Sequence, residues 1–229
     1  MAFHRGPYVV KDGLVLWLDA ANTKSYVSGS TTWRDISGNN NSGSLTNGPT
    51  FSSANGGSIV FDGSNDYAVY SGSFNNLPSS SLSAFVWIKS NLTNYYILSQ
   101  GRSTTNVEGE YILEVVNSKL IFWDYRTGYG FSNSNAGSNI SIITNQWYQV
   151  GFIKNSTSGT YYINGISAGT ISAGKDVAYT NTPFYIASNF RDNTGYLNGN
   201  ISNLQIYNRA LSASEVQQNF NALRGRYGI

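Results

Sequence analysis

Short runs in which apolar and polar residues alternate recur along the chain, separated by clusters of Gly, Asn and Ser. In one run Tyr148, Val150 and Phe152 alternate with Gln149 and Gly151, which is the two-residue period of a half-buried antiparallel strand. This many strands in one chain must form two packed sheets or a barrel. The runs that predict strands are Leu14–Leu18, Ser58–Phe61, Tyr67–Tyr70, Leu82–Lys89, Tyr95–Ser99, Glu110–Val116, Lys119–Trp123, Trp147–Lys154, Thr160–Asn164, Phe184–Ala187 and Ile201–Tyr207.

Turn signals and composition support an all-β protein. Asn117-Ser118 and Asn164-Gly165 predict tight hairpins, and Asn-Gly is the strongest two-residue hairpin signal. Charged residues make up 11% of the chain and aromatic residues 14%, whereas an ordinary soluble domain has roughly 25% charged residues. Because aromatic residues favour strands and are scarce in disordered chains, the composition predicts a folded all-β protein.

One helix is predicted near the C-terminus, beginning after Ser212 and ending at Gly225. Ser212 and Glu215 are spaced as a capping box, in which each side chain bonds a free backbone N–H group. Leu211 and Val216 are spaced for the hydrophobic contact that often accompanies such a cap. The apolar residues that share one face of this helix are Val216, Phe220 and Leu223.

The composition also excludes several classes of site. The chain has no Cys, so disulfides, thiolate nucleophiles and cysteine zinc sites are excluded, and its one histidine, His4, leaves no basis for a Ser-His-Asp relay. The net charge is +2 with Lys and Arg scattered, which indicates no nucleic-acid partner. The apolar runs are too short to span a membrane, and the first residues lack the apolar core of a signal peptide.

Several short segments occur in an order that resembles a known family. Together they resemble the concanavalin A-like, laminin G-type jelly roll, over about residues 13–223. The resemblance implies a two-sheet antiparallel jelly-roll β-sandwich, with residues 1–12 and 224–229 as terminal arms. The segments are Gly13–Asp19, Trp33–Asn39, Val60–Tyr67, Trp147–Val150, Tyr162–Gly165 and Ile206–Ser212.

The sequence around these segments, from Gly6-Pro7 to Leu14 and at Leu223–Tyr227, is similar to that of single-domain proteins found among the structural proteins of tailed phages. That similarity implies a virion protein made in the host cytoplasm, with capsid or other virion proteins as partners. Because the chain shows no heptads or repeats for a fibre stem, we expect a capsid decoration protein, present as a homo-oligomer on the particle surface. The alternative is a carbohydrate-binding module of a tail fibre or vertex, or a free lectin.

An enzyme is a more remote alternative, because the resembled fold also hosts glycan hydrolases. Glycosidases need two carboxyl groups about 5–5.5 Å or 6.5–9.5 Å apart. Glu108, Glu110 and Glu114 share one face of a regular strand, since even steps separate them. A solvated strand face explains the same pattern, and we expect no enzymatic activity.

Calcium is the one candidate cofactor, and none is required by the sequence. Asp35, Asn39 and Asn41 place side-chain oxygens at alternate positions of a tight loop, and Asp62 and Asp66 could supply more. Calcium accepts six to eight oxygen ligands, including amides and backbone carbonyls. The same residue types form turns by bonding their own backbone, so a structural turn and a calcium site both remain open.

Two stretches combine aromatic side chains with amides and charges, as sugar-binding loops do. Rings cover the apolar face of a sugar, while Asn, Asp and Arg bond its hydroxyl groups. Aromatic residues are equally effective as anchors of protein interfaces, so both roles remain open. The candidate residues are Trp123, Tyr125, Arg126, Tyr129 and Phe131 in one stretch, and Phe190, Arg191, Asp192 and Tyr196 in the other.

The two terminal arms carry residue types that are enriched in interface cores. They hold Arg5, Tyr8, Arg224, Arg226 and Tyr227, which we expect to bind neighbouring subunits or a shell. Tails that merely pack against their own domain are the alternative.

Overall fold

A computed structural model of the chain describes residues 7–70, 80–100, 110–126, 130–131, 137–156, 158–172, 183–189 and 194–229. For residues 110–111, 124–126 and 130–131 the description covers the backbone alone. Some predicted site residues therefore lie outside the described part, namely Arg5, Tyr129, Phe190, Arg191 and Asp192. Those described by their backbone alone are Tyr125, Arg126 and Phe131.

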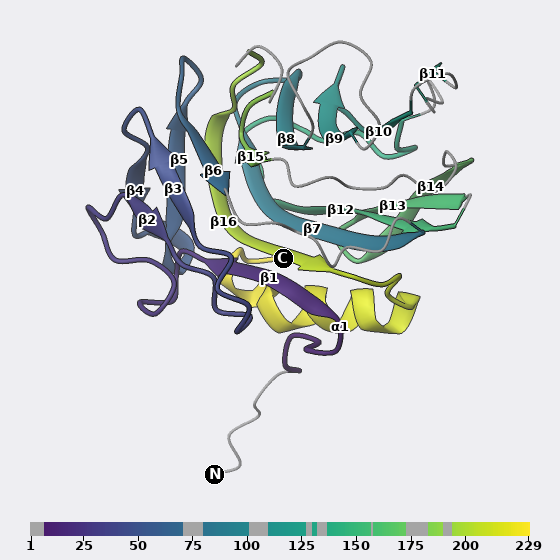
Figure 1. The fold of residues 1–229 in the computed structure, drawn as a ribbon, viewed down its shortest axis with the longest axis horizontal. Helices are drawn as coiled ribbons and strands as arrows, with labels where there is room; N and C mark the ends of the chain where they lie inside the picture. The colour runs from purple at the N-terminus through teal and green to yellow at the C-terminus, as the bar shows by residue number, and fades with distance from the viewer. Residues whose placement is uncertain are drawn as a thin grey trace.

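The strands form two antiparallel sheets that pack face to face, which confirms the predicted jelly-roll β-sandwich (Figure 1). In spatial order, sheet A consists of β14 (Ile166–Ser172), β13 (Ser158–Ile163), β12 (Tyr148–Asn155), β7 (Ser81–Ser90), β16 (Asn198–Tyr207), β5 (Ser58–Asp62) and β4 (Thr50–Ser52), with β1 (Leu14–Asp19) also paired to β16. Sheet B consists of β11 (Gly130–Phe131), β10 (Lys119–Arg126), β9 (Glu110–Val116), β8 (Tyr95–Gln100), β15 (Phe184–Ile186), β6 (Tyr67–Tyr70), β3 (Gly43–Thr46) and β2 (Thr32–Trp33).

The core lies between the sheets and follows the alternation in the sequence. Phe122 of sheet B and Phe152 of sheet A stack with ring centroids 3.9 Å apart and an interplanar angle of 12°. Tyr161 lies beside them, and its buried hydroxyl oxygen accepts the backbone N–H of Phe122 at 3.1 Å. Alternate residues of each strand thus meet between the layers, as a half-buried strand requires.

The two predicted hairpins are confirmed by the backbone conformation of their turns. The φ angles are 49° and 65° at Asn117 and Ser118, and 51° and 75° at Asn164 and Gly165. Positive φ at both central residues is the type I′ turn, whose twist matches that of the flanking strands. Asn and Gly adopt this left-handed region more readily than other residues, which is why they occur there.

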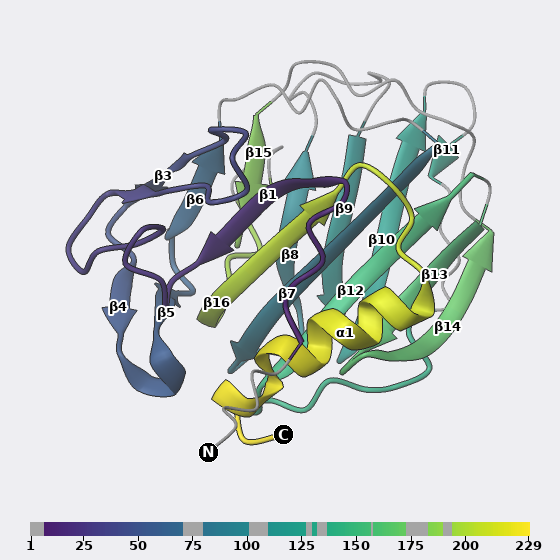
Figure 2. The ribbon, with the colours of Figure 1, turned by 90° about the horizontal axis from the view of Figure 1, so that it is seen from below.

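The predicted helix is α1 (Ala213–Leu223), which covers the outer face of sheet A (Figure 2). The Oγ atom of Ser212 accepts the N–H of Glu215, and a carboxylate oxygen of Glu215 accepts the N–H of Ser212 at 2.8 Å, so the capping box is present. Val216, Phe220 and Leu223 are buried as predicted. Because α1 packs on the outer face of sheet A, the central strands β7, β12 and β16 are buried on both faces.

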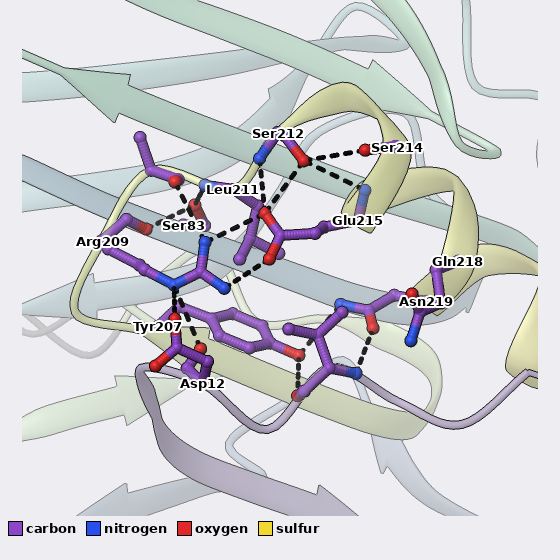
Figure 3. A network of polar contacts seen from close by, with 12 residues as sticks. Asp12, Ser83, Tyr207, Arg209, Leu211, Ser212, Ser214, Glu215, Gln218 and Asn219 are labelled. Carbon is purple, nitrogen blue, oxygen red and sulfur yellow. Dashed lines mark hydrogen bonds and ion pairs between the residues drawn. The ribbon is translucent and has the colours of Figure 1, made fainter.

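A polar network fixes the start of α1 to the sheet (Figure 3). Arg209 bonds both carboxylate oxygens of Glu215 and also pairs with Asp12 at 2.9 Å. The Arg209 guanidinium, with the Ser212 donors, lowers the pKa of Glu215 to about 2. Ser83 of β7 bonds both sides of this turn, because its hydroxyl donates to the Arg209 carbonyl and accepts the Leu211 N–H. The helix is therefore held by charge as well as by its apolar face.

The α-helix ends at Leu223 with Arg224 as its C-cap, so the predicted stop, Gly225, is the first residue beyond the cap. The chain continues from Leu223 into a 3₁₀ turn, Arg224–Arg226, that contains Gly225, and the left-handed glycine is Gly228 with φ 74°. Among the described residues, no helix is both long and apolar enough to cross a membrane.

Several strands have no counterpart among the predicted runs. Four of them, β2, β3, β4 and β11, span two to four residues, too short to show a period. β14 is longer, but its sequence ISAGTIS consists mostly of Ser, Gly, Thr and Ala, which are turn or neutral residues. They are strands because they pair with neighbouring strands, and not because their own sequence shows a period.

Candidate functional site

Several strand ends of sheet B lie in register at one end of the sandwich. Phe184 pairs with both Tyr70 and Gln100, Gln100 pairs with Tyr111, and the next residue, Glu110, pairs with Tyr125. Figure 2 shows this end of β8 and β10 on the side away from the C-terminus. Side chains near such ends can converge on one ligand because a rigid sheet positions them.

Three side chains from adjacent strands meet on the outer face of sheet B, toward the opposite ends of β8 and β9. Tyr96 of β8 lies opposite Glu114 of β9 in the strand register. The carboxylate of Glu114 accepts hydrogen bonds from the indole N–H of Trp123 and from the Tyr96 side chain. A buried carboxylate therefore fixes the orientation of two aromatic rings that are each only partly buried.

The second predicted stretch reaches the same place through Gly195. The carbonyl oxygen of Gly195 accepts the backbone N–H of Tyr96 at 3.0 Å. Gly195 has a φ of 60°, and a Cβ atom there would lie 2.3 Å from the Tyr96 ring, so only glycine allows this contact. Tyr196 follows Gly195 directly in the chain, so its backbone lies one residue from this contact. We call Tyr96, Glu114, Trp123 and Tyr196 the Glu114 cluster.

Trp123 belongs to one predicted stretch, and Tyr196 of the other stretch directly follows Gly195, whose backbone bonds Tyr96. The sequence analysis missed Tyr96, and it considered Glu114 only as a catalytic carboxylate. A signal was present, since Tyr96, Glu114 and Trp123 all lie in predicted strands at polar-face positions. The register that sets them side by side could not be obtained from one sequence.

Burial raises the pKa of the Glu114 carboxyl group. The residue is 8% exposed, and desolvation raises the pKa of its carboxyl group, while the hydrogen bonds from Trp123 and Tyr96 act in the opposite direction. Glu108 lies outside the described residues, and Glu110 is described by its backbone alone. Glu110 and Glu114 are four positions apart along β9, which separates their backbones by about 13 Å at 3.3 Å per residue. This distance exceeds the spacing of a glycosidase pair.

The candidate calcium loop is held together by the side chain of Asp35. Its Oδ1 atom accepts the N–H groups of Trp17 at 3.0 Å and Ser37 at 2.8 Å. Its Oδ2 atom accepts the N–H of Asn41 at 3.0 Å and the hydroxyl of Ser37 at 2.8 Å. Both oxygens are thus already used by the protein, as in a structural turn.

The same loop covers the free edge of β1. The amide nitrogens of Asn39 and Asn41 donate to backbone carbonyls of β1, at 3.1 Å to Leu14 and 2.9 Å to Val15. Side chains here replace a neighbouring strand, which protects an edge from pairing with other molecules.

The other predicted calcium ligands, Asp62 and Asp66, lie away from this loop. They flank the turn from β5 to β6, where an Asp66 oxygen accepts the Asp62 N–H at 3.2 Å. Asn47, which follows β3, donates to the carbonyl of this turn, whereas the Asp35 loop leads into β3 at Gly43. The two groups therefore lie at opposite ends of β3, about 10 Å apart or more. Within the described residues, no three acidic or histidine side chains gather as metal ligands. Calcium binding stays a prediction.

The terminal residues are divided between the interior and the surface. Tyr227 stacks on Trp87 at 4.0 Å, and Arg226 bonds both carboxylate oxygens of buried Asp19 at 2.8 and 3.0 Å. Tyr8 is 66% exposed and Arg224 is also exposed. The folded unit therefore extends past the expected boundary at 223, through Tyr227.

The N-terminal boundary moves in the same way. Val9 is buried, and Val10 donates its N–H to the Asn219 side chain of α1 at 2.8 Å. Val9 and Val10, expected in an arm, pack against α1 and belong to the body of the sandwich.

The comparisons with known proteins agree with this architecture. A laminin G-type family model, described as the Concanavalin A-like lectin/glucanases superfamily, matches residues 62–217. The chain therefore belongs to that superfamily, a class of lectin-like jelly-roll domains. The search of curated proteins found no significant match.

Solved structures share the fold at low sequence identity. The binding domain of Paraclostridial Mosquitocidal Protein 1 matches with a TM-score of 0.68 at 20% identity, over 93% of this chain and 52% of that chain. Domain 4 of AbnA, an extracellular arabinanase from Geobacillus stearothermophilus, solved in complex with arabinotriose, matches with a TM-score of 0.66 at 20% identity, over 91% and 98%. The binding domain of Botulinum neurotoxin DC, solved in complex with rat synaptotagmin II, matches with a TM-score of 0.69 at 17% identity, over 93% and 52%.

This chain thus spans about half of the toxin binding domains and nearly all of the arabinanase domain. The similarity establishes a lectin-like fold, and these structures are described as binding domains or as a domain of a hydrolase.

Proposed function

We propose that the protein is a non-enzymatic recognition domain that binds carbohydrate through the Glu114 cluster. The observation that carries the proposal is the contact of Trp123 and Tyr96 with one buried carboxylate on the outer face of sheet B. Partly buried rings can cover the apolar face of a sugar. Rings whose orientation is already fixed lose little conformational entropy when a ligand binds, which favours affinity.

The absence of a nearby second carboxylate among the described side chains of this cluster supports binding rather than hydrolysis. A hydrolase would use Glu114 with a partner 5–9.5 Å away, and Glu110 starts about 13 Å away along the strand. Glu110→Gln would abolish turnover if the protein were a hydrolase. We expect no release of reducing ends from a panel of polysaccharides, with or without this substitution.

The test of the binding proposal is a glycan screen of the full chain followed by titration of the best ligand. We expect saturable binding that Trp123→Ala and Tyr196→Ala each weaken by about tenfold or more. Tyr8→Ala is the matched control, because Tyr8 is an exposed tyrosine beside α1. Binding that persists unchanged in both cluster variants would contradict the proposal, as would the absence of any glycan ligand.

We propose further that this domain is carried on the surface of a tailed-phage particle as a capsid decoration protein. Its support is the similarity of the terminal segments to phage structural proteins, together with the place of Tyr8 and Arg224. Both are exposed and adjoin α1, on the face of sheet A opposite the Glu114 cluster. A domain anchored by that face would leave the cluster exposed, and many copies would multiply weak contacts.

The copy number per purified particle tests this proposal, measured by quantitative mass spectrometry against the major capsid protein. Hundreds of copies support decoration. A few tens of copies or fewer would replace it with a fibre or vertex role, and no copies at all would contradict a virion role while leaving the carbohydrate proposal intact.

A further inference from the structure

A hollow of about 500 Å³ opens where the edges of the two sheets meet, between the loop before β2, the turn after β3 and strand β4. β2 is the edge strand of sheet B and β4 is the edge strand of sheet A, at the left of Figure 1. This volume falls within the roughly 300–1,000 Å³ of small-molecule sites. The Glu114 cluster lies on β8–β10, on the far side of β15, β6 and β3.

Aromatic and aliphatic side chains line one side of this hollow. The rings of Tyr26 and Phe51 lie 5.5 Å apart at 34°, with Leu45 and Pro49 also in the lining. Tyr26 and Leu45 are buried at 4% and 8% exposure, whereas Phe51 is half-buried. The ring of Phe51 is therefore the aromatic surface that a ligand can reach.

Hydroxyl groups also belong to the lining. Ser28, Thr31 and Thr50 are exposed and lie in the lining. Gly29 and Gly48 also belong to the lining, and a Cβ atom on either would meet no atom within 4 Å, so backbone groups there are open to a ligand. Hydroxyl groups both donate and accept hydrogen bonds, which suits a ligand that carries several hydroxyl groups.

The lining holds no carboxylate, ammonium, guanidinium or imidazole group. A charged ligand would lose hydration there without gaining an ionic partner, whereas a neutral one would not. From these features we propose that the hollow is a second binding site, which takes a neutral sugar residue with one apolar face against Phe51. This site does not depend on the Glu114 cluster.

The test uses saturation-transfer NMR on the full chain with methyl glucoside, methyl galactoside, methyl mannoside and methyl arabinofuranoside, and with glucuronate as the charged probe. We expect at least one neutral glycoside to bind and glucuronate not to bind. Phe51→Leu keeps an apolar side chain but removes the ring, and should weaken binding by about tenfold. Thr31→Trp, at an exposed rim position, should block the hollow and abolish binding.

Two control variants separate this site from the other one. Thr170→Trp adds the same bulk at an exposed position of β14 and should leave binding unchanged. Trp123→Ala removes a ring of the Glu114 cluster, so binding that persists in Trp123→Ala and is lost in Phe51→Leu belongs to the hollow. The proposal is overturned if no neutral glycoside binds, if binding survives both Phe51→Leu and Thr31→Trp, or if only Trp123→Ala removes it. Unchanged melting temperatures of Phe51→Leu and Thr31→Trp establish that a loss is not unfolding.

Discussion

The outer faces of the two sheets carry similar residues in opposite arrangements. On sheet A, Trp87 is 1% exposed and is covered by Phe220 and Tyr227 of the same chain, stacked at 5.7 and 4.0 Å. On sheet B, Trp123 stays half-buried, and its indole N–H donates to the carboxylate of Glu114. The protein's own aromatic side chains seal one face, whereas the described rings of the other face stay partly exposed. An aromatic side chain therefore indicates a binding site only when the fold leaves its face uncovered.

The largest expected difference is between the two tryptophans. Trp87→Ala should lower the free energy of unfolding by about 3–5 kcal/mol, because it opens a cavity beneath α1. Trp123→Ala should cost less than half of that, since its ring is only partly buried. Urea unfolding of the two variants measures both values, and equal losses would contradict the contrast between the faces.

Next in size is the ion pair that holds the C-terminal segment. Arg226→Met leaves Asp19, which is 1% exposed, without its guanidinium partner and should cost about 2–3 kcal/mol. Arg224→Met is the matched control two residues away. Its guanidinium lies 5.9 Å from the Phe220 ring at the surface, so its loss should cost under about 1 kcal/mol. Unfolding curves in which the two variants match would show that residues 224–229 behave as a loose tail.

A smaller effect is the pH dependence of stability, which has opposite signs for a glutamate on each of the two faces. Arg209 lowers the pKa of Glu215 to about 2, so its stabilisation is complete above its ordinary value of 4.5 and is lost as the pH falls toward 2. Burial raises the pKa of Glu114, so the wild type loses stability as the pH rises through the range just above 4.5.

Glu215→Gln should therefore cost about 1 kcal/mol at pH 7, a value reduced by solvent screening, and almost nothing near pH 2. The stability of Glu114→Gln relative to that of the wild type should be highest above the raised pKa of Glu114 and lowest at low pH. Melting temperatures between pH 2 and 7 measure both, and parallel pH profiles would contradict the assigned environments.

The smallest effect concerns calcium. Because both oxygens of Asp35 already accept N–H and O–H groups, EDTA should shift the melting temperature by less than about 1 °C. A larger drop that added calcium reverses would show that an ion binds at a site not formed by these contacts alone.

The parts that the sequence predicted are those with a local cause. The Ser212 capping box and the Asn164-Gly165 turn depend on residues within a few positions of each other, and both are confirmed. The contact of Tyr227 with Trp87 depends on residues distant in the chain and was not predicted, whereas β14 pairs with β13 across the predicted Asn164-Gly165 turn. The Glu114 cluster combines the two cases. Its residue types could be read from the sequence, but the register that joins β8, β9 and β10 could not.

The central claim is that the outer face of sheet B, and not the sealed face of sheet A, recognises the ligand. The indole N–H signals of Trp123 and Trp87 report on the two faces separately, and Trp→Phe variants assign them. Titration with the best glycan, followed by ¹H–¹⁵N NMR, should shift the Trp123 signal progressively while the Trp87 signal stays fixed. A shift of Trp87 with Trp123 unchanged would contradict the account and assign binding to the helix-covered face.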